Sequence, residues 1–248
     1  MRASSPCSRH GSLSLRNLRS LRLAVALAIA AAGVVPLAAS AVPITVPTGF
    51  NPGDQYRLAF VTSTTRDATS SNIADYNAFV TGVANTVTEL VALNTTWTAI
   101  ASTGGAASDN TSTDPNVNGT GVRIFLLNGT KLADSNADLW DGSIDTQFNI
   151  NETGSLIAAE VWTGANEFGG PATLWPLGVG GSVIYARIGS TEFVDYLWVN
   201  AARSFATTSK PFYAISNVLT VIPEPTTATL LALGLIGLGV SRGTFVRS

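Results

Sequence analysis

Residues 42–222 of this sequence predict an α+β fold, built from short twisted β-strands, one early amphipathic helix and long polar loops. Three observations predict it. The apolar period of a helix occurs once, near the start of this region. Short apolar, β-branched runs recur through the rest, and segments rich in Gly, Asn, Asp, Thr and Ser separate them. We expect a single domain, because about 180 residues suffice for one core and no internal repeat is present.

The helix is expected over residues 72–91. Its apolar residues follow alternating steps of three and four and form one continuous stripe: Ile73, Tyr76, Val80, Val83, Val87 and Leu90. Asn72 is the expected N-cap, with Asp75 three residues later as in a capping box. Because Gly82 and several threonines lower the helix propensity, packing against a sheet must supply most of the stability. The stripe is therefore interpreted as core, and a groove for a partner is the alternative.

The strands are expected where apolar runs lie between turn-forming residues. They cover residues 56–63, 97–102, 122–127, 158–163, 183–188, 196–199 and 211–221. Asn128 and Gly129 form a typical hairpin turn after the third of these runs. Long polar loops are expected over residues 103–121 and in the Gly/Pro-rich stretch that ends at residue 181.

The first 41 residues predict a secretory signal peptide. Five arginines and no acidic residue occupy residues 1–22, and an apolar run follows over residues 23–37. Ala39 and Ala41 fit the small-x-small pattern of a cleavage site, so the mature chain is expected to begin at Val42. No twin-arginine pair is present, which indicates the general secretion machinery. A retained N-terminal membrane anchor is the alternative.

The segment 223–248 carries the most specific pattern in the chain. Pro223, Glu224 and Pro225 precede a charge-free apolar run over residues 226–240, and Arg242 lies in the short tail after it. As a helix this run spans roughly 22 Å, and extension to residue 246 reaches the length that crosses a bilayer. We expect a C-terminal transmembrane helix, and a buried core helix is the alternative.

A Pro-Glu-Pro triplet, one membrane-spanning stretch and a basic end, in this order, resemble the PEP-CTERM sorting signal of exported bacterial proteins. The resemblance implies recognition by a membrane-embedded exosortase, cleavage near the triplet, and anchoring in the inner membrane during transit. The implied destination is the cell surface or the extracellular space. The tail departs from the family in one respect, because Arg242 and Arg247 make a sparse basic end and not a dense cluster.

The domain between the two signals is acidic and lacks Cys and His. It holds seven Lys and Arg against fifteen Asp and Glu, a formal net charge of −8. Nucleic acid is therefore not an expected partner. The only Cys, Cys7, and the only His, His10, both lie in the signal peptide. The domain consequently has no disulfide, no Cys or His ligand for zinc, copper or haem, and no Ser-His-Asp or Cys-His catalytic site.

Seven strings between residues 50 and 222 are similar to a recurring ectodomain of PEP-CTERM proteins. They cover residues 58–65, 71–79, 97–103, 138–142, 161–164, 197–200 and 212–216. Their order also resembles a C-type-lectin-like fold, in which a strand and a helix lead to a Trp-containing strand, long loops, a late Trp strand and a closing strand. The disulfide cysteines of true lectins are absent here, and Trp198-Val199-Asn200 is only part of a Trp-Asn-Asp sugar motif. Sugar binding does not follow from this fold alone.

Acidic and amide side chains gather between residues 134 and 145. Oxygen ligands at the first, third and fifth positions of a tight loop, with an acid at the twelfth, suit a hard cation such as Ca²⁺. The candidate ligands are Asp134, Asn136, Asp138, Asp141 and Asp145. The match to an EF-hand is incomplete, because Leu139 takes the position of the turn glycine. A surface turn with locally satisfied side chains is the alternative.

Five tryptophans divide into two groups. Trp140 and Trp175 lie in segments rich in Gly, Asp and Pro, where a flat ring can stack on a sugar ligand. Trp97, Trp162 and Trp198 lie in apolar strand contexts and are expected in the core.

Scattered carboxylates leave a hydrolytic alternative open. Glu152, Glu160 and Glu167 offer partners for Asp141 or Asp145 in the acid/base pair of a glycoside hydrolase. Such a pair requires a separation of roughly 5–9 Å, which a sequence does not specify.

The sequence therefore predicts an exported, exosortase-sorted protein of the cell surface or extracellular matrix, and we do not expect an enzyme. No catalytic residue is assigned. Exopolysaccharide is the expected partner, with Ca²⁺ as a candidate cofactor. A carboxylate-dependent glycan hydrolase and a purely structural coat protein are the alternatives.

Overall fold

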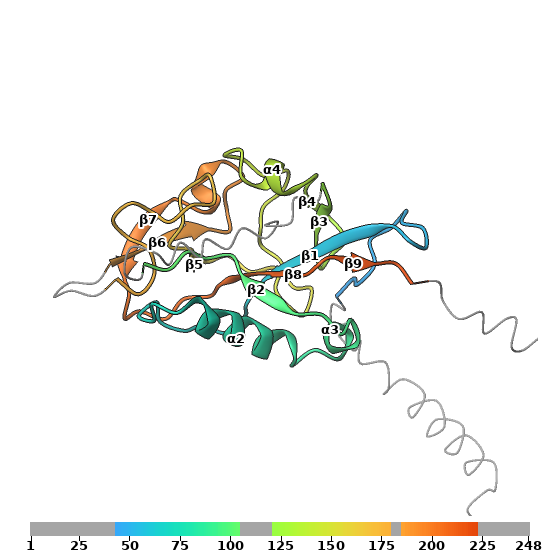
Figure 1. Cartoon of the computed structure of the whole chain (residues 1–248), viewed down its shortest axis with the longest axis horizontal. Coiled ribbons are helices and arrows are strands. Elements are labelled where there is room, and N and C mark those ends of the chain that lie inside the picture. The colour runs from blue at the N-terminus through green and yellow to red at the C-terminus, as the bar shows by residue number, and fades with distance from the viewer. Residues whose placement is uncertain (1–42, 105–120, 180–184, 223–248) are drawn as a thin grey trace, which may run out of the picture. The chain divides into compact units, whose positions relative to one another are not determined.

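The computed structural model describes residues 43–104, 121–179 and 185–222 (Figure 1). It has an α+β architecture in which strands predominate and helices are few, as the sequence predicts. The predicted signal peptide, its cleavage site at Ala39 and Ala41, and the sorting signal with Pro223, Glu224, Pro225 and Arg242 lie outside the described residues. Among the residues that are described, no helix is both long enough and apolar enough to span a membrane.

The larger sheet is built around β1 (Gln55–Val61). Every residue of β1 except the first is buried. β1 pairs in parallel with β3 (Arg123–Leu126) and antiparallel with β8 (Tyr213–Ser216) and β9 (Leu219–Thr220). β2 (Trp97–Ala99) and β4 (Lys131–Ala133) complete the order β2-β8-β1-β3-β4. Of the described strands, the first, β1, and the last, β9, therefore lie side by side (Figure 1).

The smaller sheet consists of three antiparallel strands in the order β5-β6-β7. These are β5 (Glu160–Trp162), β6 (Tyr185–Ser190) and β7 (Ala202–Phe205). A bridge between Trp162 and Phe212, next to β8, joins this sheet to the larger one. The sequence did not predict β7, because its residues Ala-Arg-Ser-Phe are mostly exposed on the sheet edge and show no apolar run.

The predicted helix over residues 72–91 is two helices, α2 (Ile73–Ala84) and α3 (Thr88–Ala92). α2 lies along β2 (Figure 1), and the Asn72 side chain caps it by accepting from the N–H of Ala74. It ends because the Thr86 hydroxyl and N–H both donate to the Val83 carbonyl, and the chain then becomes extended at Val87. The prediction of one continuous helix is therefore wrong.

The apolar stripe itself faces the core across this break. Tyr76, Val80, Val83 and Leu90 are buried, and Ile73 and Val87 pack partly buried against the same core. The interpretation of the stripe as core is confirmed.

The strand predicted over residues 196–199 is a 3₁₀ turn, η1 (Tyr196–Trp198). Its backbone turns because the Asp195 carboxylate caps it by accepting from the N–H of Leu197. Trp198 is nevertheless buried, as are Trp97 and Trp162, so the placement of these three tryptophans in the core is confirmed.

Candidate functional site

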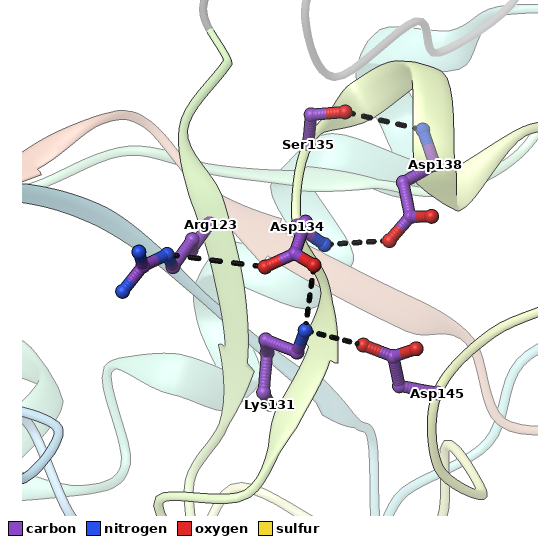
Figure 2. A network of polar contacts seen from close by, with 6 residues as sticks. All are labelled: Arg123, Lys131, Asp134, Ser135, Asp138 and Asp145. Carbon is purple, nitrogen blue, oxygen red and sulfur yellow. Dashed lines mark hydrogen bonds and ion pairs between the residues drawn. The ribbon is translucent and has the colours of Figure 1, made fainter.

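The Asp-rich segment forms a compact polar network beside β4. Ser135 caps a short helix, α4 (Asn136–Leu139), by accepting from the Asp138 N–H. Asp138 in turn accepts from the backbone N–H of Asp134 at 2.6 Å. Carboxylate oxygens of Asp134, Asp138 and Asp145 lie within 4.8 Å of one another (Figure 2). Three of the five predicted metal ligands thus come together.

A lysine already occupies this acidic cluster. The Lys131 ammonium lies 2.7 Å from Asp134 and 2.9 Å from Asp145 (Figure 2). Arg123, on β3, adds a longer contact of 3.8 Å to Asp134. The hydrogen bond from Lys131 lowers the pKa of Asp134, and the two carboxylates raise the pKa of Lys131. A cation that binds here therefore has to compete with an ammonium group of the same chain.

The other two predicted ligands lie nearby with different roles. Asn136 is the first residue of α4. Asp141 accepts from the N–H and the hydroxyl of Ser143 at 3.1 and 3.2 Å, which is the local turn that the sequence left open as the alternative.

An open hollow of about 660 Å³ adjoins the lysine side of this network. Two aromatic rings line it, Phe50 and Phe125, which meet edge to face with their centroids 5.3 Å apart. Its lining also includes four charged side chains: Asp54, Arg123, Lys131 and Asp134. The hollow therefore combines apolar ring surface with donors and acceptors of hydrogen bonds.

The two tryptophans expected to stack on a ligand are both partly covered by protein. Trp140 packs against the buried ring of Trp198, with centroids 5.4 Å apart, and its Nε1 is buried without a hydrogen-bond partner. Trp175 lies under two guanidinium groups, those of Arg187 and Arg203, at 4.5 and 4.6 Å from the ring centroid. Their role in ligand stacking stays a prediction.

The carboxylates considered for hydrolysis each have a separate partner. Glu152 is buried and accepts from Ser63, Glu160 pairs with Lys210 at 2.6 Å, and Glu167 accepts from the Asn200 amide at 2.6 Å. Asp145 binds Lys131, and Asp141 binds Ser143. The only acidic group of three or more that comes together within the described ranges is Asp134, Asp138 and Asp145.

Sequence reasoning missed the cationic side chains of these sites: Arg123, Lys131, Arg187 and Arg203. All four lie on strands, in the two hairpins formed by β3–β4 and β6–β7. In β6 the alternation of Tyr185 and Arg187 with the buried Ala186 and Ile188 was an available signal, because it places every second side chain on one face. β3 and β4 show no such alternation. No protein-family model matches this chain, and no curated protein matches it.

Proposed function

We propose that this is an exported, exosortase-sorted protein of the cell surface or extracellular matrix, and that its domain binds polysaccharide without turning it over. The sequence supports the sorting, through the signal peptide and the order of triplet, apolar stretch and basic end. General secretion machinery and an exosortase are the partners of this route, with the inner membrane as a stage in transit.

The observation that carries the binding proposal is the hollow lined by Phe50 and Phe125. Sugars offer hydroxyl groups around a ring with apolar C–H faces. The partly exposed Phe50 supplies apolar contact, backed by the nearly buried Phe125, while Arg123 and Asp134 supply a donor and an acceptor at the same rim. An open, largely polar hollow suits one or a few residues of a long chain that continues into solvent.

We also propose a C-type-lectin-like fold for the domain. The order of β1, α2 and the Trp-containing β2 supports it, as does the closing strand β8 with Tyr213. The late Trp segment departs from it, because Trp198 lies in a 3₁₀ turn and not in a strand.

Ca²⁺ assistance is a separate part of the proposal. Asp134, Asp138 and Asp145 supply three carboxylates of the kind that Ca²⁺ prefers. Because Lys131 already neutralises two of them, Ca²⁺ has to displace its ammonium, and the site is expected to be weak.

The test is co-sedimentation of the exported protein with the exopolysaccharide of its own host, in Ca²⁺ and in EDTA. The wild type should be retained without release of reducing ends. Arg123→Gln should weaken retention roughly tenfold, as expected for one charge-assisted hydrogen bond. The Arg123 side chain is 60% exposed, so its loss should leave folding intact.

Arg66→Gln is the matched control. It removes the same charge, from a guanidinium that lies over Tyr76 at 4.8 Å and outside the hollow. Equal retention of both variants would place binding elsewhere, and no retention of the wild type in either buffer would leave a structural coat as the better account.

A further inference from the structure

One face of the smaller sheet carries arginine and aromatic side chains side by side. β6 and β7 are neighbouring strands (Figure 1). Their register places Tyr185 opposite Phe205 and Arg187 opposite Arg203. Because alternate residues of a strand point to the same side, these four side chains share one face. Trp175 joins them, since its carbonyl accepts from the Arg187 N–H at 2.8 Å.

These five residues, which we call the arginine–aromatic face, form a continuous stack. Phe205 stacks on Tyr185 with ring centroids 4.6 Å apart. Arg203 lies over both Tyr185 and Trp175, at 4.9 and 4.6 Å from the ring centroids. Arg187 lies over Trp175 at 4.5 Å. At these distances between guanidinium and ring centroid, the aromatic ring attracts the guanidinium by a cation–π interaction.

No ion pair among the described residues neutralises the positive charge of this face. Within the described part of the chain, the ion pairs involve Arg123, Lys131 and Lys210, and neither Arg187 nor Arg203. The Nε of Arg187 is buried without a hydrogen-bond partner, and its Nη1 donates only a long bond of 3.5 Å to the Ala202 carbonyl.

Among the described acids, Glu167 is the one whose charge acts on Arg187, and no ion pair joins the two. Burial lowers the pKa of Arg187, and the charge of Glu167 offsets this in part. The Glu167 carboxylate itself accepts from the Asn200 amide at 2.6 Å. Arg203 and Phe205 are exposed, with Phe205 at 52%, so the face is open to a ligand.

A guanidinium that is stacked on a ring is held in a position that favours binding of a carboxylate. A ring covers the flat surface of the group and leaves the N–H groups along its edge uncovered by that ring. Arg203 is exposed, whereas the Nε of Arg187 is buried. A guanidinium edge matches the two oxygens of a carboxylate, and a side chain that is already held loses little entropy on binding. Two such groups on neighbouring strands can receive two anionic groups of one chain.

We propose that the arginine–aromatic face binds the carboxylate groups of an acidic polysaccharide, in which uronic acid residues supply the negative charge. This rests on the proposed function, which makes polysaccharide the partner, and it adds the chemical class of the ligand at a second site. The argument is charge complementarity at this face, where two arginines lie without an ion pair to any described residue. The domain as a whole carries a net charge of −8. That net charge disfavours long anionic chains at a distance, but salt confines the repulsion to about 8 Å at physiological ionic strength.

The test measures the affinity of the exported protein for polygalacturonate and for the same polymer with its carboxyl groups reduced to alcohols. The wild type should bind the acidic polymer at least about tenfold more tightly. Arg203→Gln should remove this preference, and Arg203→Lys should restore only part of it, because a lysine keeps the charge without the bidentate edge. Arg66→Gln, which removes another ring-stacked guanidinium, should leave the preference unchanged.

Equal affinity for the two polymers would overturn the inference. So would a preference that Arg123→Gln removes and Arg203→Gln does not, because the hollow would then be the carboxylate site. The proposed function survives either result if the wild-type protein still co-sediments with the host exopolysaccharide. The wild type could instead fail to co-sediment with the host exopolysaccharide and still bind polygalacturonate through Arg203. That result would overturn the proposed binding at the hollow and leave this inference standing.

Discussion

The buried carboxylate of Glu152 accepts two hydrogen bonds from Ser63, a residue 89 positions earlier in the chain. The backbone N–H donates at 2.8 Å, and the hydroxyl donates to the second oxygen. Ser63 follows the end of β1, where Val61 forms a bridge with Asn151. Glu152 therefore holds a distant turn against the central strand, and its role is structural, as the acceptor of these two hydrogen bonds.

Glu152→Gln should lower the free energy of unfolding by about 1–3 kcal/mol. The amide can present only one oxygen, so its NH₂ group faces one of the two Ser63 donors in a site with little water. Denaturant unfolding of the two proteins measures the difference. Glu89→Gln is the matched control, because Glu89 is exposed and its change should stay within about 0.5 kcal/mol. Similar values for both variants would contradict the structural role of Glu152.

Gly189→Ala should destabilise the domain by more than about 2 kcal/mol. A Cβ at this position of β6 would overlap the backbone carbonyl of Trp198, which cannot move without shifting η1. Gly82→Ala makes the same chemical change inside α2, where no atom lies within 4 Å of the added Cβ. There it should stabilise by about 0.5–1 kcal/mol, because alanine has the higher helix propensity. Thermal or denaturant unfolding checks the opposite signs, and an unchanged or raised stability of Gly189→Ala would refute the close packing of β6 against Trp198.

Lys131→Gln should raise the pKa of Asp134 toward its ordinary value of 3.8. The hydrogen bond from the ammonium is the largest cause of the lowered pKa, and the glutamine amide carries no charge. In the wild type the folded pKa is below the unfolded one, so the contribution of Asp134 to stability is present above pH 3.8 and is lost as the pH falls through the folded value. NMR titration of the carboxylate carbon measures the shift, and an unchanged pKa would mean that Lys131 does not pair with Asp134 in solution.

Lys131→Gln should also bind Ca²⁺ more tightly than the wild type, because it removes the competing ammonium from Asp134 and Asp145. Binding to the folded state raises the melting temperature by mass action. Ca²⁺ should therefore raise it more in Lys131→Gln than in the wild type, and Asp138→Asn should reduce the effect. If Ca²⁺ changes the melting temperature of neither protein, the Asp134, Asp138 and Asp145 group is not a Ca²⁺ site.

Stability should fall as the pH rises above 10. Burial raises the pKa of Tyr56, Tyr76 and Tyr213 above 10.0, so these phenols stay protonated in the folded state while the unfolded chain begins to ionise. The unfolded state then binds fewer protons, and the free energy of unfolding decreases with pH. Lys131 acts in the same direction above pH 10.5, because its carboxylate partners raise its pKa. Unfolding midpoints measured from pH 8 to 11.5 check the sign, and a flat profile would contradict the burial of these rings.

Local patterns were sufficient wherever a side chain's environment repeats along the chain. The apolar stripe of α2 was predictable because its period of 3.6 residues places Tyr76, Val80 and Val83 on one side. The break at Val87 was not, because it depends on which hydrogen bonds Thr86 makes in competition with the helix. β7 was also missed, since an exposed edge strand has no apolar signature of its own.

The two candidate sites illustrate the same limit. The acidic segment was predictable as a cluster, because Asp134 and Asp138 are neighbours in the sequence. Lys131 lies between Asp134 and Asp145 because the N–H of Asp145 donates to the Leu132 carbonyl and brings a later loop against β4. The sequence alone does not show that contact. Trp175 was predicted as a free ring in a loop, and only the register of β6 with β7 places two guanidinium groups over it.

The sequence by itself determined the α+β class, the acidic net charge, the absence of Cys and His from the domain, and the three tryptophans of the core, because composition and short periods set these. The tertiary structure alone decided which charged groups meet. Lys131 neutralises part of the predicted metal cluster, and Arg187 and Arg203 stack on a distant tryptophan with no ion pair to any described residue. A loop contact brings Asp145 to Lys131, and strand register brings the two arginines together, because a shift of one residue would turn Arg187 or Arg203 to the opposite face.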